Sequence, residues 1–541
     1  MEFDFIVIGA GSAGCILAHR LSESGKHSVL LLEAGGMDKS LWLKLPVGFA
    51  KTYYHPKYNW MYYTEPEANM NERKLYAPRG KVVGGSGAIN AMIYVRGQPA
   101  DFDDWAAAGN PGWTYQDVLP YFKKVESHPL GDTDFHGAHG LIGITPMEAG
   151  AHPICHAYLQ ACREAGYTIN HDFNGEHFEG AGIYETNIRN GKRDSSGTAY
   201  LHPALKRPNM TLECDAQVQR ILFEKNDDGR PRAVGVEVIQ EGRTRRFNAK
   251  REVILSAGAV DSPKVLQLSG VADPALLARN EIALVHSLPA VGQHLQDHLG
   301  VSFYYEANRP TLNDDLGTLW GQVKAGMQYL FKRTGPLAMS VNQAGGFFKG
   351  TAAEDHPNLQ LYFNPLSYTI PNNPNAKLKP DPYSGFLLFF NPCRPTSRGT
   401  VEIASRNPAI PAQIRPNYLS TQKDIEEVVQ GSRLIRALAQ KPGLANVIKK
   451  EISPAQSVKS DEDMLQFFRE QAGSIYHLCG SCAMGPDAST AVVSAQLKVH
   501  GIDGLRVADA SIFPNITSGN INAATMMVAE RAAEMILSEA N

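Results

Sequence analysis

The sequence predicts a mixed α/β protein, α+β overall, in which two domains are interleaved along the chain. Three observations support this prediction. The N-terminal residues have the pattern strand, glycine turn, helix, strand, whereas the segments after Met210 have the pattern of short successive strands. The chain is also long for one core, since 541 residues with 43% hydrophobic side chains exceed what a single core usually serves.

The N-terminal unit is predicted to be a βαβ element. In chain order we expect a strand at 3–8, a glycine turn, an Ala- and Leu-rich helix ending near 24, and a strand at 28–33. The following region, 35–140, is rich in Gly, Asn and Pro, and only 115–125 has a clear helical pattern. Long ordered loops of this kind usually have a functional reason.

Short strands and a second domain are expected in the rest of the chain. Strands that return to the first domain are predicted at 211–213, 218–224, 233–239, 244–248 and 252–256. Residues 303–467 predict a second, sheet-containing domain, with strands at 359–363, 385–390 and 399–403. The Pro-, Asn- and Lys-rich stretch 369–383 predicts a mobile loop, either over a substrate entrance or simply on the surface. A helix is expected over 523–538.

Composition excludes several classes of function. The formal net charge is −3, and Lys and Arg are spread along the chain, so we do not expect a nucleic-acid partner. Seven cysteines do not suit a disulfide framework and favour a reducing, cytoplasmic location. No signal peptide and no apolar run of about 18 residues is visible. We expect a soluble protein without a transmembrane segment, and peripheral membrane contact stays open.

A nucleotide-binding fingerprint follows the first predicted strand. The sequence Gly9-Ala10-Gly11-Ser12-Ala13-Gly14 opens a helix, so its amides can approach a pyrophosphate in a Rossmann-like unit. Glu33, followed by Ala34, ends the second strand, where its carboxylate can accept hydrogen bonds from ribose hydroxyls. The fingerprint alone does not separate FAD from NAD.

Two further segments point to chemistry. The segment 79–90 has the glycine-rich sequence RGKVVGGSGAIN, which suggests backbone packed closely against a planar ring or a diphosphate. His477 lies in a short, turn-rich run, and Gly519-Asn520-Ile521-Asn522 precedes the last helix. The N-terminus of that helix carries partial positive charge, which would stabilise negative charge on a reduced flavin.

From Phe3 to about Ile536 the chain resembles the glucose-methanol-choline (GMC) oxidoreductases, especially the bacterial choline and aliphatic-alcohol dehydrogenase branch. The resemblance rests on four motifs in family order: the N-terminal fingerprint, 80–97, 258–270, and the region of His477 and Asn522. It implies a discontinuous FAD-binding domain (1–155, 208–308 and 468–541) and a substrate-binding domain (156–207 and 309–467), the latter an antiparallel sheet backed by helices.

The resemblance also implies roles for individual residues. His477 matches the catalytic histidine, and Asn522 the amide beside the flavin. The remaining cofactor contacts are Gly9, Gly11, Ser12, Ala13, Gly14, Glu33 and Ala34 at the ADP half, Val218 at the adenine, Asp509 and Ala510 near the ribityl chain, and Val83, Gly85 and Asn90 at the flavin.

Departures from the family pattern carry information. Members that attach FAD covalently through histidine have it where this chain has Ile89, so we predict non-covalent FAD. Leu478, Ser481 and Ala483 depart from the common run after the histidine and put the fine shape of the pocket in doubt. Ala272 replaces a usual glycine, which affects a turn rather than the chemistry.

No metal site is predicted. Cys479 and Cys482 form a CxxC pair, but no second pair accompanies them, and we do not interpret them as a redox dithiol or half a zinc site. His136 and His139 resemble a family loop and lack further obvious ligands for zinc.

The implied reaction is FAD-dependent oxidation of an alcohol to an aldehyde. His477 would remove the hydroxyl proton while hydride passes to flavin N5 and Asn522 donates a hydrogen bond to the alcohol oxygen. We favour a neutral primary alcohol, aliphatic or aromatic, with pocket residues Phe347, Phe363, Asn364 and Tyr476. A quinone or carrier is favoured as electron acceptor, which makes the enzyme a dehydrogenase. The alternatives are an oxidase that uses O2, a hydroxynitrile lyase of the same fold, a non-catalytic flavoprotein and an NAD-dependent dehydrogenase.

Overall fold

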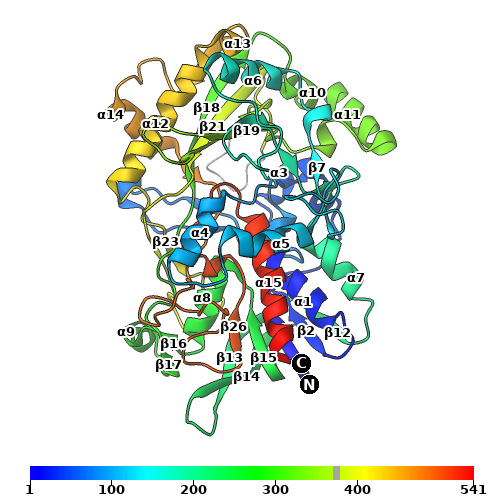
Figure 1. Cartoon of the computed structure of the whole chain (residues 1–541), viewed down its shortest axis with the longest axis vertical. Helices are drawn as coiled ribbons and strands as arrows, with labels where there is room; N and C mark the ends of the chain where they lie inside the picture. Colours follow the sequence, from blue (N-terminus) through cyan, green and yellow to red (C-terminus); the bar gives the residue numbers. More distant parts are fainter. Residues whose placement is uncertain (370–377, 541) are drawn as a thin grey trace.

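The computed structural model describes residues 1–369 and 378–540, and two seven-stranded sheets organise them (Figure 1). The first sheet has the order β12 (Met210–Glu213), β2 (Val29–Leu32), β1 (Glu2–Ile8), β15 (Arg243–Leu255), β14 (Pro231–Gln240) and β13 (Ala216–Lys225), and β26 (Leu505–Val507) also pairs with β15. The pairings of β12, β2, β1, β15 and β26 are parallel, and β15, β14 and β13 form an antiparallel meander.

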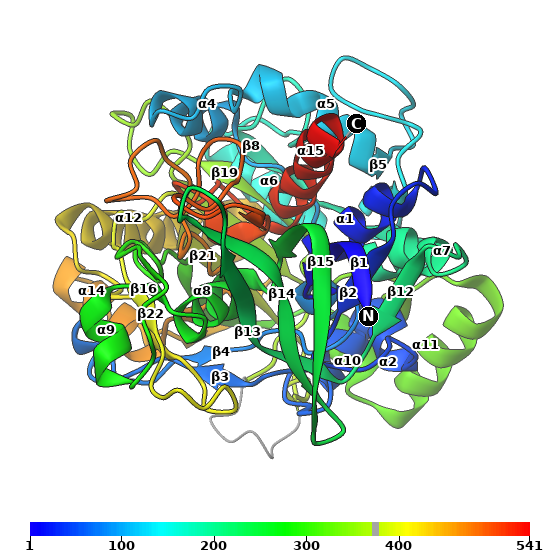
Figure 2. The same cartoon turned by 90° about the horizontal axis from the view of Figure 1, so that it is seen from below.

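The parallel strands are buried on both faces, as their sequences indicate. Phe5 to Ile8 of β1 and all four residues of β2 are buried, which explains their uninterrupted apolar runs. Phe5 pairs with Val29 on one side and with Glu252 on the other. Helices α1 (Ser12–Ser22) and α15 (Asn522–Ala540) pack against each other beside this sheet (Figures 1 and 2).

Every pairing in the second sheet is antiparallel. The order of its strands is β24 (Ile448–Ser453), β18 (Leu299–Ala307), β21 (Gly385–Pro392), β20 (Leu359–Asn364), β19 (Ala344–Phe348) and β8 (Gly180–Ile183), with β25 (Gly473–Ser474) also on β18. Helices α6 (Ile154–Glu164), α12 (Gln422–Ala439) and α14 (Asp461–Gln471) contribute buried apolar residues to its core. The predicted antiparallel sheet backed by helices is therefore present.

Shorter elements connect and flank the two sheets. The remaining helices are α2 (Leu41–Lys44), α3 (Phe49–Thr52), α4 (Pro99–Ala107), α5 (Tyr115–Val125), α7 (His202–Ala204), α8 (Gly258–Leu268), α9 (Pro274–Arg279), α10 (Leu312–Leu316), α11 (Leu319–Lys332) and α13 (Pro442–Ala445). Short strand pairs are β3 (Tyr62–Tyr63) with β4 (Tyr76–Ala77), β5 (Glu126–Ser127) with β6 (Ile142–Gly143), β7 (Thr145–Pro146) with β9 (Glu185–Thr186), β10 (Ile188–Arg189) with β11 (Lys192–Arg193), β16 (Val271–Ala272) with β17 (His286–Ser287), and β22 (Thr400–Glu402) with β23 (Gln413–Arg415). No helix among the described residues is both long enough and apolar enough to span a membrane.

Most predicted elements are present, but α6, α8, α11, α12 and α14 were not predicted, and three further differences are informative. The strands expected at 244–248 and 252–256 are one strand, β15. The strand expected at 399–403 is β22, which lies outside the second sheet. Helix α4 was not predicted, although Pro99 at its first position and the reciprocal capping of Gln98 and Asp101 mark its start. Of the loop predicted at 369–383, residues 370–377 lie outside the described residues.

Two segments lie across the predicted domain boundaries. Strand β18 falls within 208–308, which was assigned to the FAD-binding domain, yet it pairs with β21 and β24 of the second sheet. Tyr200, Leu201 and Ala204 fall within 156–207, yet they are buried in the core of the first sheet. The chain thus crosses between the cores earlier than the predicted boundaries indicate, and the division as a whole stays a prediction.

Candidate active site

A cavity of about 1030 Å³ extends from the glycine turn after β1 to His477. Gly9, Gly11 and Glu33 line it in the first sheet, and residues of β18, β20 and β21 line it in the second. This volume lies at the upper end of what ligand sites usually enclose, so the cavity has room for a large cofactor together with a substrate.

The glycine turn leaves backbone amides free for a ligand. Gly9 has a φ of +96°, and a Cβ there would lie 2.5 Å from the carbonyl oxygen of Ser256. A Cβ at Gly14 would lie 1.9 Å from the carbonyl oxygen of Gly9, so Gly14 permits the close packing of α1 on β1. Gly11, the N-cap of α1, makes no side-chain cap, which leaves the first amides of the helix available to a phosphate.

Glu33 is fixed at the end of β2 by main-chain donors. Its Oε2 accepts from the amide of Ala10 at 2.9 Å, and its Oε1 accepts from the amide of Gly35 at 2.8 Å. Burial raises the pKa of this carboxyl, while the two amides oppose that rise. Each carboxylate oxygen retains a lone pair, so the group can still accept from ribose hydroxyls.

Most of the predicted cofactor residues line the cavity, and two do not. Those that line it are Gly9, Gly11, Ser12, Ala13, Glu33, Ala34, Gly85, Asn90, Val218, Asp509, Ala510 and Asn522. Gly14 packs α1 on β1 instead. Val83 is fully buried in the first core, and its amide donates to the carbonyl of Gly36 at 3.0 Å. The prediction that Val83 lines the flavin side is therefore wrong, and Val83 supports the loop that carries Gly85.

Asp509 and Asn90 organise two backbone turns at the cavity. Asp509 Oδ2 accepts from the amide of Gly258 at 2.8 Å and from the hydroxyl of Ser262 at 2.6 Å. Burial raises the pKa of Asp509. Asn90 Oδ1 accepts from Nη1 of Arg193 at 2.6 Å, which fixes the orientation of its amide. Both side chains therefore shape the cavity wall through contacts within the protein.

His477 is held by its backbone and by both ring nitrogens. Its amide donates to Oδ1 of Asp297 at 2.7 Å, and the preceding residue, Tyr476, has a φ of +72°. Its Nδ1 lies 2.9 Å from Nδ1 of His298, and its Nε2 lies 3.2 Å from Nδ2 of Asn520. The ring is half-buried and lines the cavity.

These contacts assign the proton positions on the two rings. Nε2 of His298 lies 2.7 Å from the carbonyl oxygen of Cys393, which can only accept, so that nitrogen carries a hydrogen. Burial lowers the pKa of His298 to about 4, so the ring is neutral and its Nδ1 is an acceptor. Nδ1 of His477 must then carry the hydrogen of that contact. Nε2 of His477 is left with a lone pair, to which Asn520 donates.

The surroundings of His477 keep its imidazole neutral. Burial, with smaller contributions from His298 and the Arg79 guanidinium, holds its pKa well below 6.5. Arg79 itself lines the cavity and donates from its guanidinium to the carbonyl of Tyr476. At neutral pH the site therefore contains an unprotonated base with its free nitrogen fixed beside an amide donor.

The amide beside His477 is that of Asn520 and not that of Asn522. Asn522 Oδ1 accepts from the hydroxyl of Ser12 at 2.7 Å and so ties the start of α15 to the start of α1. The structure therefore favours Asn520 over the predicted Asn522 as the donor to the alcohol oxygen, and the predicted cofactor contact of Asn522 stays a prediction. The sequence contained both asparagines, but only the backbone path after Gly519 decides which one reaches the histidine.

Of the predicted pocket residues, two line the cavity and two lie in the core of the second sheet, because side chains alternate between the two faces of a strand. Asn364 of β20 and Tyr476 line the cavity, and Tyr362, two positions before Asn364, does so too. Phe363 lies between them on the opposite face of the strand and stacks on Tyr158 at 5.3 Å. Phe347 is likewise fully buried in the second core. The predictions for Phe347 and Phe363 are therefore wrong, and a period of two along β20 would have identified Tyr362.

The wall formed by β18 and β21 has no carboxylate. Its cavity-lining residues are Gly300, Val301, Ser302, Tyr304, Leu387 and Phe389. A Cβ at Gly300 would lie 2.2 Å from Cζ of Phe389, so the ring of Phe389 lies directly on the Gly300 backbone. Gly300 is two residues from His298, which brings this apolar wall close to the histidine pair.

The other cysteines and histidines considered in the sequence analysis do not form a metal site in the described residues. Cys479 and Cys482 are buried, and burial raises the pKa of both thiols. In residues 1–369 and 378–540, no group of three His, Cys, Asp or Glu side chains is arranged to hold a metal ion. His139 is exposed beside Asp132.

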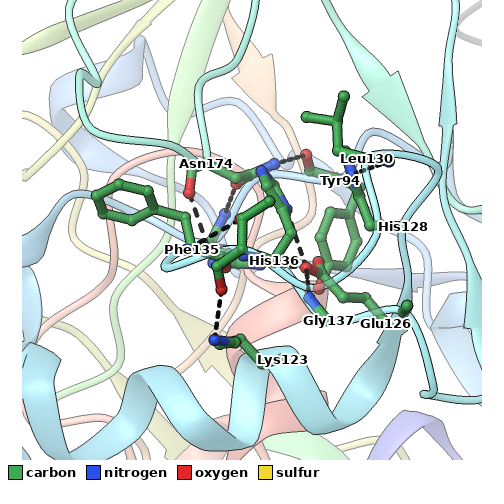
Figure 3. A network of polar contacts seen from close by, with 12 residues as sticks. Tyr94, Lys123, Glu126, His128, Leu130, Phe135, His136, Gly137 and Asn174 are labelled. Carbon is green, nitrogen blue, oxygen red and sulfur yellow. Dashed lines mark hydrogen bonds and ion pairs between the residues drawn. The ribbon is translucent and has the colours of Figure 1, made fainter.

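His136 is buried in a network of polar contacts that Figure 3 shows from close by. Its Nδ1 lies 2.9 Å from Oε1 of Glu126, and its Nε2 lies 2.8 Å from Oδ2 of Asp172. Both contacts require a hydrogen on the ring, so His136 is an imidazolium, and the two carboxylates raise its pKa to about 9 against the effect of burial. The ring of His128 stacks on it at 3.7 Å.

The family of the chain follows from comparison with known proteins. Two family models, both described as GMC oxidoreductase, match residues 3–300 and 395–529. The chain belongs to the GMC oxidoreductase family. It is accordingly an FAD-dependent oxidoreductase that acts on the CH–OH group of its donor, which confirms the predicted family, fold, cofactor and enzyme class.

Relatives of this GMC oxidoreductase are similar over almost their whole length. It is 41% identical to mitochondrial choline dehydrogenase of Mus musculus over 99% of this chain and 89% of that one. It is also 41% identical to oxygen-dependent choline dehydrogenase of Vibrio vulnificus (strain YJ016), over 99% and 94%. The crystal structure of pyridoxine 4-oxidase from Mesorbium loti is similar with a TM-score of 0.88, 29% identity and 98% coverage of both chains. An FAD-dependent oxidoreductase from Chaetomium thermophilum is similar with a TM-score of 0.90, 25% identity and 99% coverage of both.

Proposed function

We propose that this enzyme oxidises a neutral primary alcohol, aliphatic or aromatic, to the aldehyde, with His477 as the base. The observation that carries the proposal is the lone pair on Nε2 of His477, which is beside the amide of Asn520 in the cavity wall. A base of this kind needs to be unprotonated at working pH, and the lowered pKa of His477 meets that need.

Residues of the chain accept the proton and stabilise the developing negative charge. Nε2 of His477 takes the hydroxyl proton, and the resulting imidazolium keeps its Nδ1 hydrogen bond to His298. Asn520 Nδ2, displaced from Nε2 by the substrate, donates to the alcohol oxygen as it gains alkoxide character. Bound FAD supplies the acceptor, flavin N5, for the carbinol hydride. Loss of one proton and one hydride leaves the aldehyde.

The cofactor position that we propose follows the cavity. Gly9, Gly11 and Glu33 hold the ADP half, and the free amides at the start of α1 take the pyrophosphate. Gly85 and Asn90 lie on the flavin side, and the N-terminus of α15 supplies partial positive charge near the reduced ring. We propose that FAD is bound non-covalently, because Ile89 lines the cavity where covalently flavinylated relatives have histidine.

A neutral substrate suits the cavity wall better than an ammonium alcohol. Recognition of a quaternary ammonium uses aromatic faces together with negative charge. Tyrosines are present, but β18, β20 and β21 contribute no carboxylate to the lining, and Phe389 covers Gly300. Asp381 and Glu470 line the cavity outside these strands, and the carboxylate of Asp381 already accepts from the hydroxyls of Thr369 and Tyr383. The choline dehydrogenases named above make choline the second candidate substrate.

The acceptor that we propose is a quinone or a carrier, which makes the enzyme a dehydrogenase. An oxidase that reduces O2 is the alternative for this half-reaction. A lyase that uses His477 as acid and base beside a flavin that stays oxidised is the alternative for the whole reaction.

Anaerobic stopped-flow mixing of the FAD-loaded enzyme with a panel of alcohols tests the proposal. The panel includes a straight-chain primary alcohol, benzyl alcohol and choline. We expect the neutral alcohols to bleach the flavin band, and choline to do so far more slowly. Subsequent mixing with air-saturated buffer distinguishes the acceptors, since slow recolouring supports the dehydrogenase. If no alcohol bleaches the flavin, the proposed oxidation is wrong.

A further inference from the structure

Helix α11 presents an apolar face to solvent. Along its 14 residues, the exposed apolar side chains are Leu319, Trp320, Val323, Met327, Leu330 and Phe331. Trp320 is 83% exposed and Phe331 is 74% exposed. Scattered apolar side chains are normal on a protein surface, but a contiguous set on one element marks a surface that contacts something else.

The exposed face is distinct from the face that holds α11 to the protein. At about 100° per residue, the six exposed side chains fall within an arc of about 120°, and the buried residues Ala325 and Tyr329 lie on the opposite side. Tyr329 packs in a small core with Leu45 and Ala338. The apolar face is therefore not needed to pack α11 on the rest of the chain, and the helix itself lies at the edge of the molecule in Figures 1 and 2.

The charges on α11 are all of one sign. The helix contains Lys324 and Lys332 and no Asp or Glu, and Arg333 follows it in an αL C-cap. All three cations are exposed. Asp314, which precedes the helix, accepts from the amide of Thr311 at 2.7 Å and from the hydroxyl of Ser384 at 2.8 Å. A face of this composition attracts an anionic partner and repels a second copy of itself.

A neighbouring segment extends the same surface. Leu41 of α2 is 61% exposed, and the half-exposed Trp42 has the ammonium of Lys51 over its ring at 5.7 Å. Leu45, just after α2, shares a core with Tyr329 of α11, so the two segments are adjacent. Exposed Trp and Leu side chains with lysines beside them are typical of segments that lie in the interface of a bilayer.

We propose that α11, with the adjoining α2, docks this enzyme on the surface of an anionic lipid bilayer. The apolar face enters the boundary between headgroups and acyl chains, and Lys324, which flanks the apolar arc, meets anionic headgroups. Lys332 lies on the far side of the helix, and Arg333 lies over the ring of Tyr329 at 4.8 Å. Docking here places one side of the cavity next to lipid. Helix α10, which contacts α11, contributes Leu312 and Leu316 to a small core. That core also contains Phe49 and Tyr368, and both of these residues line the cavity.

Sedimentation of the FAD-loaded enzyme with lipid vesicles tests this proposal. We expect the enzyme to sediment with vesicles of phosphatidylcholine and phosphatidylglycerol, and much less with phosphatidylcholine alone. Trp320→Glu with Phe331→Glu should lower the partition coefficient at least about tenfold. Lys324→Glu should weaken the preference for phosphatidylglycerol, and added salt should weaken it in the wild type.

The matched control replaces two exposed leucines elsewhere. Leu130 is 63% exposed and Leu284 is 54% exposed, and Leu130→Glu with Leu284→Glu should leave vesicle binding unchanged. Retained FAD and unchanged turnover with a soluble dye acceptor show that each variant is folded. If the Trp320 and Phe331 double variant does not retain FAD, the single change Trp320→Ser replaces it in the same comparison.

Two results would overturn the proposal. One is wild-type enzyme that stays in the supernatant with phosphatidylglycerol vesicles, or that sediments no better than the Trp320 and Phe331 variant. The other is a wild-type dimer in gel filtration that the same double variant dissociates, because a second copy would then cover α11. Vesicle binding is measured without alcohol, so its failure is distinguishable from failure of the proposed oxidation.

Discussion

His298 and His477 meet edge to face, with their Nδ1 atoms 2.9 Å apart and their ring planes at 81°. The carbonyl of Cys393 fixes the hydrogen of His298 on Nε2, and His298 in turn fixes the hydrogen of His477 on Nδ1. A main-chain acceptor on β21's C-terminal side thus determines which nitrogen of His477 faces the cavity without a proton. Substitutions of His477 and of His298 test this relationship.

His477→Ala should lower kcat roughly 10² to 10⁴-fold, because it removes the base and leaves Gly9, Gly11 and Glu33 in place to hold FAD. The measurement is anaerobic flavin reduction by a primary alcohol, with FAD content determined in parallel. His139→Ala is the matched control, since that ring is exposed and does not line the cavity. Near-full turnover in the His477 variant would show that another group accepts the proton.

His298→Ala should lower kcat with little change in KM, because His477 loses the acceptor that fixes its tautomer. His298→Asn should recover part of the rate, since its Oδ1 can accept from His477 while its Nδ2 donates toward Cys393. A structural role alone would make the two variants equally slow. Equal rates would therefore contradict the positioning role.

The pH dependence of kcat/KM should show an acidic limb displaced below the ordinary pKa of histidine. Burial, His298 and Arg79 hold the pKa of His477 well below 6.5, so its Nε2 stays unprotonated as pH falls through that value. Activity should be lost only at lower pH, when protonation removes the lone pair. The measurement is kcat/KM for a neutral alcohol between about pH 5 and 9. An inflection at or above 6.5 would be inconsistent with the site described.

Substitution of Asn520 should mainly lower kcat/KM, whereas substitution of Asn522 should mainly weaken FAD binding. Asn520→Ala removes the donor beside Nε2 of His477 and should lower kcat/KM roughly ten- to hundredfold. Asn522→Ala breaks the contact with Ser12 at the start of α1 and should weaken FAD binding more than it slows flavin reduction by alcohol. Titration of the apoprotein with FAD and single-turnover reduction of the loaded enzyme separate the two effects. The opposite pattern would restore Asn522 as the donor.

The sequence predicted those parts of the site that depend on local backbone geometry. The glycines of the N-terminal turn and Glu33 are placed by one βαβ unit, and their spacing alone locates them. His477 was located by its resemblance to a family motif, and it lines the cavity. The contact of His298 with His477 was not predicted, because 179 positions separate the two residues and only the pairing of β18 with β25 brings them together.

Errors at the substrate end have a different physical cause. Phe347 and Phe363 are apolar residues in the core next to the cavity, and apolar character does not tell which face of a strand looks inward. Val83, predicted on the flavin side, lies in a turn whose path the sequence did not show. Asn520 and Asn522 are two positions apart, and the turn at Gly519, with its φ of +91°, decides which of them points to His477. Side-chain direction therefore limited the sequence prediction more than the position of elements did.

His136 should stabilise the protein in a pH-dependent way. Glu126 and Asp172 raise the pKa of His136 to about 9, against about 6.5 in the unfolded chain. The native state therefore keeps a proton that the unfolded state releases between these values, so this stabilisation is complete below pH 6.5 and is lost as pH rises through about 9. Its size is at most about 3 kcal/mol by linkage, and Arg96 pairs with Glu126 throughout.

Thermal unfolding of the FAD-loaded enzyme and of His136→Gln checks this contribution. At about pH 6 we expect a clear difference in Tm between the two proteins, which should shrink as pH approaches about 10 because wild-type His136 then loses its charge. His139→Gln, at an exposed histidine of the same loop, should match the wild type at both values. A difference between wild type and His136→Gln that stays constant with pH would mean that packing against His128, and not the charge, is what the substitution removes.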